Sequence, residues 1–130
     1  VAGTEPGRPS SSARSVLHLD LHLFNVLVDD GSADVTGVLD WANTAAGDPD
    51  LDRARSWSIL TQDPHTRPYR DHPVWNAFVD GWGTAAEFAT IPASARLWAA
   101  RFMLADLGGR VPPGDLAHVE RLVLELEAQG

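Results

Sequence analysis

Residues 16–28 of the chain are Val16-Leu17-His18-Leu19-Asp20-Leu21-His22-Leu23-Phe24-Asn25-Val26-Leu27-Val28. Apolar residues open and close it, and β-branched residues are frequent in both apolar runs. Such short runs are typical of strands. The stretch therefore predicts two strands, with a polar segment between them that carries Asp20 and Asn25.

A third apolar run, Val35 to Leu39, follows the polar sequence Asp29-Asp30-Gly31-Ser32. An Asp- and Gly-rich segment between two strand-like runs indicates a hairpin, which we expect over residues 25–41. Antiparallel pairing brings the start of the first strand and the end of the second to the same end of a hairpin. We therefore expect Asn25 and Asp40 to lie close together.

Helical patterns fill the rest of the chain. In Asp48-Pro49, the Asp is a typical N-cap and the Pro a typical first helical residue. Helices are predicted over about 49–60, 74–82, 92–107 and 115–128, with a connection over 62–73. The predicted fold class is mainly α with a small β-hairpin. Residues 1–15 are predicted to be a flexible linker or loop, and 16–130 one domain, with the catalytic loop and hairpin in 16–41 and the helical part in 48–129.

Composition excludes several classes of function. The 130-residue chain has ten Arg, no Lys, no Cys and a formal net charge of −8. The absence of Cys excludes disulfides and zinc-thiolate sites, and the absence of Lys excludes Schiff-base chemistry and a P-loop. The negative charge argues against nucleic acid as a partner. No apolar run is long enough to cross a bilayer and no signal peptide is apparent, so we expect no membrane partner and a cytoplasmic location.

Asp20 and Asn25 have the spacing of the kinase catalytic loop, H-R-D-x-x-x-x-N, in which the Asp accepts the proton of the substrate hydroxyl and the Asn holds magnesium. A site of this kind also needs a second carboxylate, which binds magnesium together with Asn25. Asp40, at the end of the next strand, is placed for that role. Oxygen ligands and a small number of carboxylates suit magnesium.

These residues resemble the C-terminal lobe of the aminoglycoside phosphotransferase family, which has a protein-kinase-like fold. The family pattern reads H-G-D-x-H-x-x-N, then [IV]-D-W, then G-D-P-x-x-D. Here it corresponds to residues 18–25, to Leu39-Asp40-Trp41 and to residues 47–52. Leu19 replaces the usual Gly, and Leu23-Phe24 replaces a commoner Pro-Gly pair.

The resemblance implies a role for each matching residue. Asp20 would be the catalytic base, and Asn25 and Asp40 would hold magnesium. His18 would support the loop by hydrogen bonding, while His22 either lines the site or stabilises the loop. Two further carboxylates would be structural, capping the next helix and tying it to the catalytic loop: Asp48 and Asp52.

The implied reaction is transfer of the γ-phosphoryl group of ATP to a hydroxyl of a small molecule, such as an aminoglycoside or a related amino alcohol, with Mg²⁺ as cofactor and ATP as co-substrate. A complete kinase of this kind has an N-terminal lobe with a Lys that contacts the phosphates. Because this chain has no Lys and no such lobe ahead of Val16, we expect a C-terminal lobe that is inactive alone. Its partner would be the missing N-terminal lobe of the same enzyme.

Two other interpretations stay open. The run His18-x-Asp20-x-His22 has the composition of a zinc or iron site in a metal-dependent hydrolase, although this interpretation leaves Asn25 and Asp40 unexplained. Alternatively, the chain is a non-catalytic kinase-like scaffold or a truncated relative. The presence of Asp20, Asn25 and Asp40 argues against that second possibility.

Overall fold

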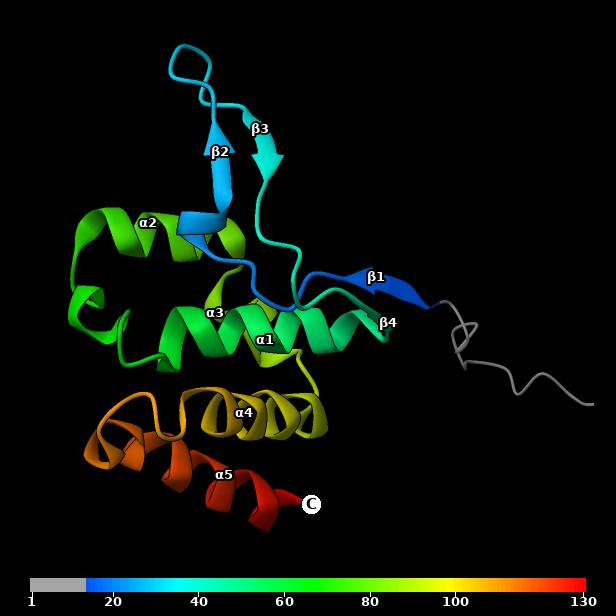
Figure 1. Cartoon of the computed structure of the whole chain (residues 1–130), viewed down its shortest axis with the longest axis vertical. Coiled ribbons are helices and arrows are strands. Elements are labelled where there is room, and N and C mark those ends of the chain that lie inside the picture. Colours follow the sequence, from blue (N-terminus) through cyan, green and yellow to red (C-terminus); the bar gives the residue numbers. More distant parts are fainter. Residues whose placement is uncertain (1–13) are drawn as a thin grey trace, which may run out of the picture.

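A computed structural model describes residues 14–130 (Figure 1). It is mostly helical, with two small antiparallel sheets. Most of the linker predicted over residues 1–15 lies outside the described residues, and Ser15 is the first residue of a strand. Within residues 14–130, no helix combines the length and the apolar character needed to cross a membrane.

The first sheet pairs β1 (Ser15–Leu17) with β4 (Ala45–Gly47). β1 was predicted, whereas β4 was not, because its three small residues carry no strand pattern. The last residue of β4 is a glycine for a steric reason, because a Cβ on Gly47 would lie 3.0 Å from the buried side chain of Leu17. The small residues of β4 let its backbone approach β1 closely.

The predicted hairpin is confirmed. It joins β2 (Val26–Val28) to β3 (Val35–Val38), with Val26 opposite Val38. The amide of Leu39 donates to the carbonyl of Asn25 at 2.8 Å, which extends the pairing beyond both strands. The loop is organised by the Asp29 carboxylate, which accepts from the amides of Gly31 and Ser32. Figure 1 shows the hairpin projecting away from the helices.

The helical part contains α1 (Pro49–Gln62), α2 (Pro73–Trp82), α3 (Ala85–Ala89), α4 (Ala93–Leu107) and α5 (Ala117–Gln129). Short 3₁₀ turns lie at η1 (Leu23–Asn25), η2 (Arg67–Tyr69) and η3 (Pro113–Leu116). The four predicted helices correspond to α1, α2, α4 and α5. The prediction missed α3, although Thr84 and Glu87 form a complete capping box at its start. The Asp48 side chain caps α1 by accepting from the amide of Asp50 at 2.9 Å.

The core lies on both sides of α4. One side packs against α1 through small side chains, and the other packs against α5 and η3. In Figure 1, α1 lies between the hairpin side of the molecule and α4, with α5 beyond. α1 therefore has two partners: α4 on its core side and the predicted catalytic loop on the other. The buried residues of the two clusters are Ala54, Ile91, Ala95 and Ala99, and Ala100, Met103, Leu107, Leu116 and Val119.

Candidate functional site

The segment between β1 and η1 is held against one face of α1. The Asp52 carboxylate accepts from the amides of His18 (3.1 Å) and Leu19 (2.9 Å). Ser56, one turn later, donates its hydroxyl to the carbonyl of Leu21 at 3.2 Å. Residues three and four apart share a helix face, so α1 holds successive backbone groups of this loop.

Leu19 has the most unusual backbone in the loop. Its φ of 64° lies in the left-handed region, which costs a residue with a Cβ about 1–2 kcal/mol. The side chain is nevertheless buried, and contacts from α1 fix both its amide, at Asp52, and its carbonyl, at Arg55 (3.1 Å from Nε). The surrounding structure therefore imposes this conformation on the residue just before Asp20.

His18 connects the loop to the end of the hairpin. Its Nδ1 accepts from the amide of Asp20 at 3.1 Å, so the ring proton is on Nε2, which donates to the carbonyl of Leu39 at 2.7 Å. The ring is buried and packs edge-on against Trp41, with centroids 4.7 Å apart. Both ring nitrogens are thus engaged within the protein.

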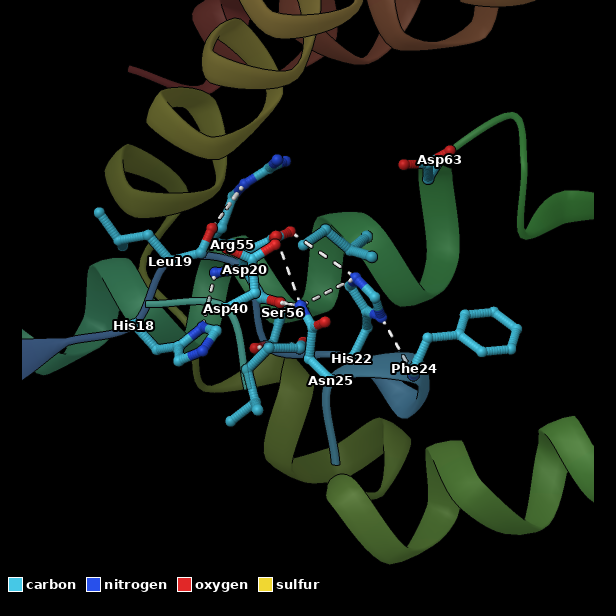
Figure 2. A network of polar contacts seen from close by, with 12 residues as sticks. His18, Leu19, Asp20, His22, Phe24, Asn25, Asp40, Arg55, Ser56 and Asp63 are labelled. Atoms are coloured by element: carbon cyan, nitrogen blue, oxygen red, sulfur yellow. Dashed lines mark hydrogen bonds and ion pairs between the residues drawn. The ribbon is translucent and has the colours of Figure 1, made fainter. Parts of the chain in front are cut away.

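Asp20, His22 and Asn25 form a compact polar cluster (Figure 2). Asn25 donates Nδ2 to the backbone carbonyl of Asp20 at 2.8 Å, and its contact with the Asp20 carboxylate is longer, at 3.4 Å. His22 Nδ1 accepts from the amide of Phe24 at 3.2 Å, and its Nε2 lies 3.7 Å from the Asp20 carboxylate. His22 therefore both caps η1 and stands beside the predicted base.

Asp40 reaches the same region from the end of the hairpin. It follows Leu39, whose amide is bonded to Asn25, so the pairing brings Asn25 and Asp40 to one end. Asp40 and Asp20 line the same cavity, and in Figure 2 Asp63 stands apart from the loop residues, at the end of α1. Asp40 has a φ of 58° and is solvent-exposed.

A cavity of about 450 Å³ opens over this cluster. Asp20, His22 and Asp40 line one part of it, and the rest is lined by residues of η1, α1, α2 and α4 and of the segments after the hairpin, after α1 and after α4. No sequence pattern brings the helical residues among them together, because their approach depends on how the helices pack. The additional polar and aromatic lining residues are Phe24, Arg55, Asp63, His65, Trp75, Asp106 and Arg110.

Further acidic and basic side chains line the cavity and contact one another. His65 Nδ1 lies 2.9 Å from the Asp63 carboxylate. Asp106 faces Arg110 at 3.1 Å and Arg55 at 3.7 Å. With Asp20 and Asp40 included, carboxylates outnumber the two Arg side chains around the cavity.

Asn25 and Asp40 fit a magnesium ion by their chemistry. Because Asn25 uses Nδ2 to hold the carbonyl of Asp20, its Oδ1 is the amide atom left to act as a ligand, and Asp40 supplies a carboxylate. Magnesium keeps several waters and takes one or two carboxylates. Within residues 14–130, no three His, Asp or Glu side chains gather as metal ligands, and His18 has no free nitrogen. The hydrolase interpretation therefore does not fit this arrangement.

The comparison with protein families agrees with the predicted resemblance. A family model described as the phosphotransferase enzyme family matches residues 4–99, which include the loop, the hairpin and the first three α-helices. Comparisons with curated proteins and with solved structures found no match.

Proposed function

The chain belongs to the phosphotransferase enzyme family, and we propose that it is the C-terminal lobe, of protein-kinase-like fold, of an ATP-dependent small-molecule kinase. The observation that carries this proposal is that Asp20 and Asp40 line one cavity, with the buried Asn25 directly behind Asp20 and hydrogen-bonded to its backbone carbonyl. These three residues have the chemistry required for phosphoryl transfer: a base and two oxygen ligands for a metal.

In the proposed reaction, Asp20 accepts the proton of the acceptor hydroxyl. The hydroxyl oxygen forms a bond to the γ-phosphorus of ATP as the bond to the β–γ bridging oxygen breaks, releasing ADP. Magnesium held by Asn25 and Asp40 would neutralise phosphate charge during this transfer. His22, 3.7 Å from Asp20, helps to orient the base, and α1 holds the loop that carries it.

The lining of the cavity supports a cationic acceptor. Asp63 and Asp106 add carboxylates beyond the proposed base and metal ligands. Phe24 and Trp75 add aromatic rings, which attract ammonium groups through their π faces. A hydroxylated amine such as an aminoglycoside or related amino alcohol matches this chemistry. We further propose that an N-terminal lobe of the same enzyme supplies the nucleotide-contacting Lys that this chain lacks.

The test is to purify the natural gene product that carries this sequence, measure its intact mass, and follow ADP formation from ATP with a panel of hydroxylated amines. We expect a product longer than 130 residues, and ADP formation that requires both Mg²⁺ and an acceptor. A product of these 130 residues that binds no nucleotide would contradict the proposal. It would favour a non-catalytic kinase-like scaffold instead.

A further inference from the structure

Arg55 is a charged residue that no sequence motif singled out, yet only 4% of the residue's surface is exposed. It lies in α1 and lines the same cavity as Asp20. Burial lowers the pKa of its guanidinium, and the nearby carboxylates of Asp106 and Asp20 oppose that shift. A buried charge is costly unless its partners compensate, so its position calls for an explanation.

The guanidinium is fixed from the α4 side. It stacks over the ring of Phe102, 4.5 Å from the centroid, and its NH2 group lies 3.7 Å from Asp106. Both partners belong to α4. The α1–α4 packing therefore determines where the planar group lies and which way its Nε points.

Nε points to the catalytic loop. It donates to the carbonyl of Leu19 at 3.1 Å (Figure 2). Leu19 is the residue with a φ of 64°, and Asp20 follows it directly. Asp52 fixes the amide of Leu19, so Arg55 supplies the second contact that holds this left-handed residue.

We infer that Arg55 is a positioning residue for phosphoryl transfer: through the Leu19 carbonyl it holds the backbone conformation that places Asp20 at the cavity. The inference rests on the proposed function for its catalytic consequence. The structural claim is that the hydrogen bond from Nε holds the loop. The charge of the guanidinium anchors the side chain on α4 through Asp106 and Phe102.

Two substitutions separate the hydrogen bond from the charge. In Arg55→Gln, the amide nitrogen occupies the chain position of Arg Nε, so a donor is kept and the charge is lost. In Arg55→Lys, a methylene occupies that position, so the charge is kept and the donor is lost. Arg55→Met loses both. Arg53→Gln is the matched control, because Arg53 is on the same helix but contacts Asp50 and Thr90 rather than the loop.

The readout is amide hydrogen exchange at Leu19 and Asp20, compared with the buried helix residue Ala99. We expect the Lys and Met substitutions to accelerate exchange at Leu19 and Asp20 at least tenfold relative to Ala99. The Arg55→Gln substitution and the Arg53→Gln control should change the exchange rates of Leu19 and Asp20 relative to Ala99 less than threefold. In the natural gene product, the Lys and Met substitutions should lower kcat at least tenfold and leave the acceptor KM within threefold.

Three results would overturn the inference: faster exchange in Arg55→Gln than in Arg55→Lys, no local change in any variant, or an increase shared equally by Ala99. The last would mean that Arg55 stabilises the whole fold only. The exchange result does not depend on catalysis. A protein that transfers no phosphate would therefore contradict the proposed function, while the exchange pattern would still decide the role of Arg55.

Discussion

At the residue scale, left-handed backbone marks both the site and the hairpin loop. Leu19, Ala33 and Asp40 all have φ near 60°. Leu19 directly precedes the proposed base Asp20, and contacts from Asp52 and Arg55 hold its strained backbone. Asp40 is itself a proposed metal ligand. Ala33 is exposed in the hairpin loop, so burial of its side chain does not offset the free-energy cost of the left-handed backbone.

Ala33→Gly should therefore stabilise the protein by about 0.5–1 kcal/mol, because Gly adopts this φ without the Cβ clash. Urea denaturation measures the change in the free energy of unfolding. The same substitution at Ala77, an exposed residue within α2, should destabilise by a similar amount. Equal effects at the two sites would show that the left-handed backbone at residue 33 does not reduce the free energy of unfolding.

Asp40 provides a test of the proposed metal site. Asp40→Asn should weaken Mn²⁺ binding at least tenfold, because it replaces the only carboxylate assigned to the metal by a neutral amide. Titration monitored by electron paramagnetic resonance of free Mn²⁺ measures the affinity. Asp34→Asn, which removes an exposed carboxylate in the hairpin loop, is the control. Equal affinities for the two variants would exclude Asp40 as a ligand.

At the scale of elements, the sequence predicted those whose patterns are local. The strand-like runs, the hairpin turn and the Asp48-Pro49 helix start were all recognisable. Asp20 and Asn25 were proposed as site residues from their spacing, and Asp40 from its place at the end of the second hairpin strand. β4 was not predictable, since Ala45-Ala46-Gly47 forms a strand only by pairing with β1. The capping-box pair Thr84 and Glu87 was available as a signal for α3.

The burial of Arg55 had no local signal. A charged residue in an amphipathic helix is normally expected at the surface, and this one is buried because Phe102 and Asp106 of α4 pack over it. Asp63 and Trp75 likewise had no local signal. They line the same cavity although they belong to different segments of the chain. Tertiary contacts, rather than periodicity, complete the site.

The attachment of the loop to α1 depends on Asp52. Asp52→Ala should destabilise the protein by about 2–3 kcal/mol, because it leaves the amides of His18 and Leu19 without their acceptor. Asp50→Ala, which removes a partly exposed carboxylate from the same turn, should cost less than about 1 kcal/mol. Thermal or urea unfolding compares the two, and equal losses would contradict the anchoring role of Asp52.

The start of α3 should be sensitive to acid. The pKa of Glu87 is lowered from its ordinary value of 4.5, first because the carboxylate accepts a hydrogen bond from the amide of Thr84. A lowered pKa in the folded state means that the stabilisation is present above the ordinary value and is lost as pH falls through the lowered one.

The amide shift of Thr84 followed by NMR should thus titrate at a pH below 4.5. Glu87→Gln should abolish that titration and leave the core resonances unchanged. A Thr84 amide that titrates at or above the ordinary Glu value would show that the capping box does not form in solution.

At the scale of the whole molecule, α1 connects the site to the core. One side packs on α4, and the other holds the proposed catalytic loop through Asp52, Arg55 and Ser56. The hairpin places Asp40 at the same cavity as Asp20. Phosphoryl transfer needs the base and the metal ligands fixed relative to each other, and this arrangement would fix the proposed ones to one helix and one hairpin.

The proposed catalytic base is tested by comparing the kcat of phosphoryl transfer of the natural gene product with that of its Asp20→Asn variant, with Asp34→Asn as the control. We expect a loss of about 10²–10⁴-fold for Asp20→Asn, the usual contribution of a general base, with the fold intact by circular dichroism and with Asp34→Asn unaffected. Retained transfer in a folded Asp20→Asn variant would contradict the assignment of Asp20 as the base.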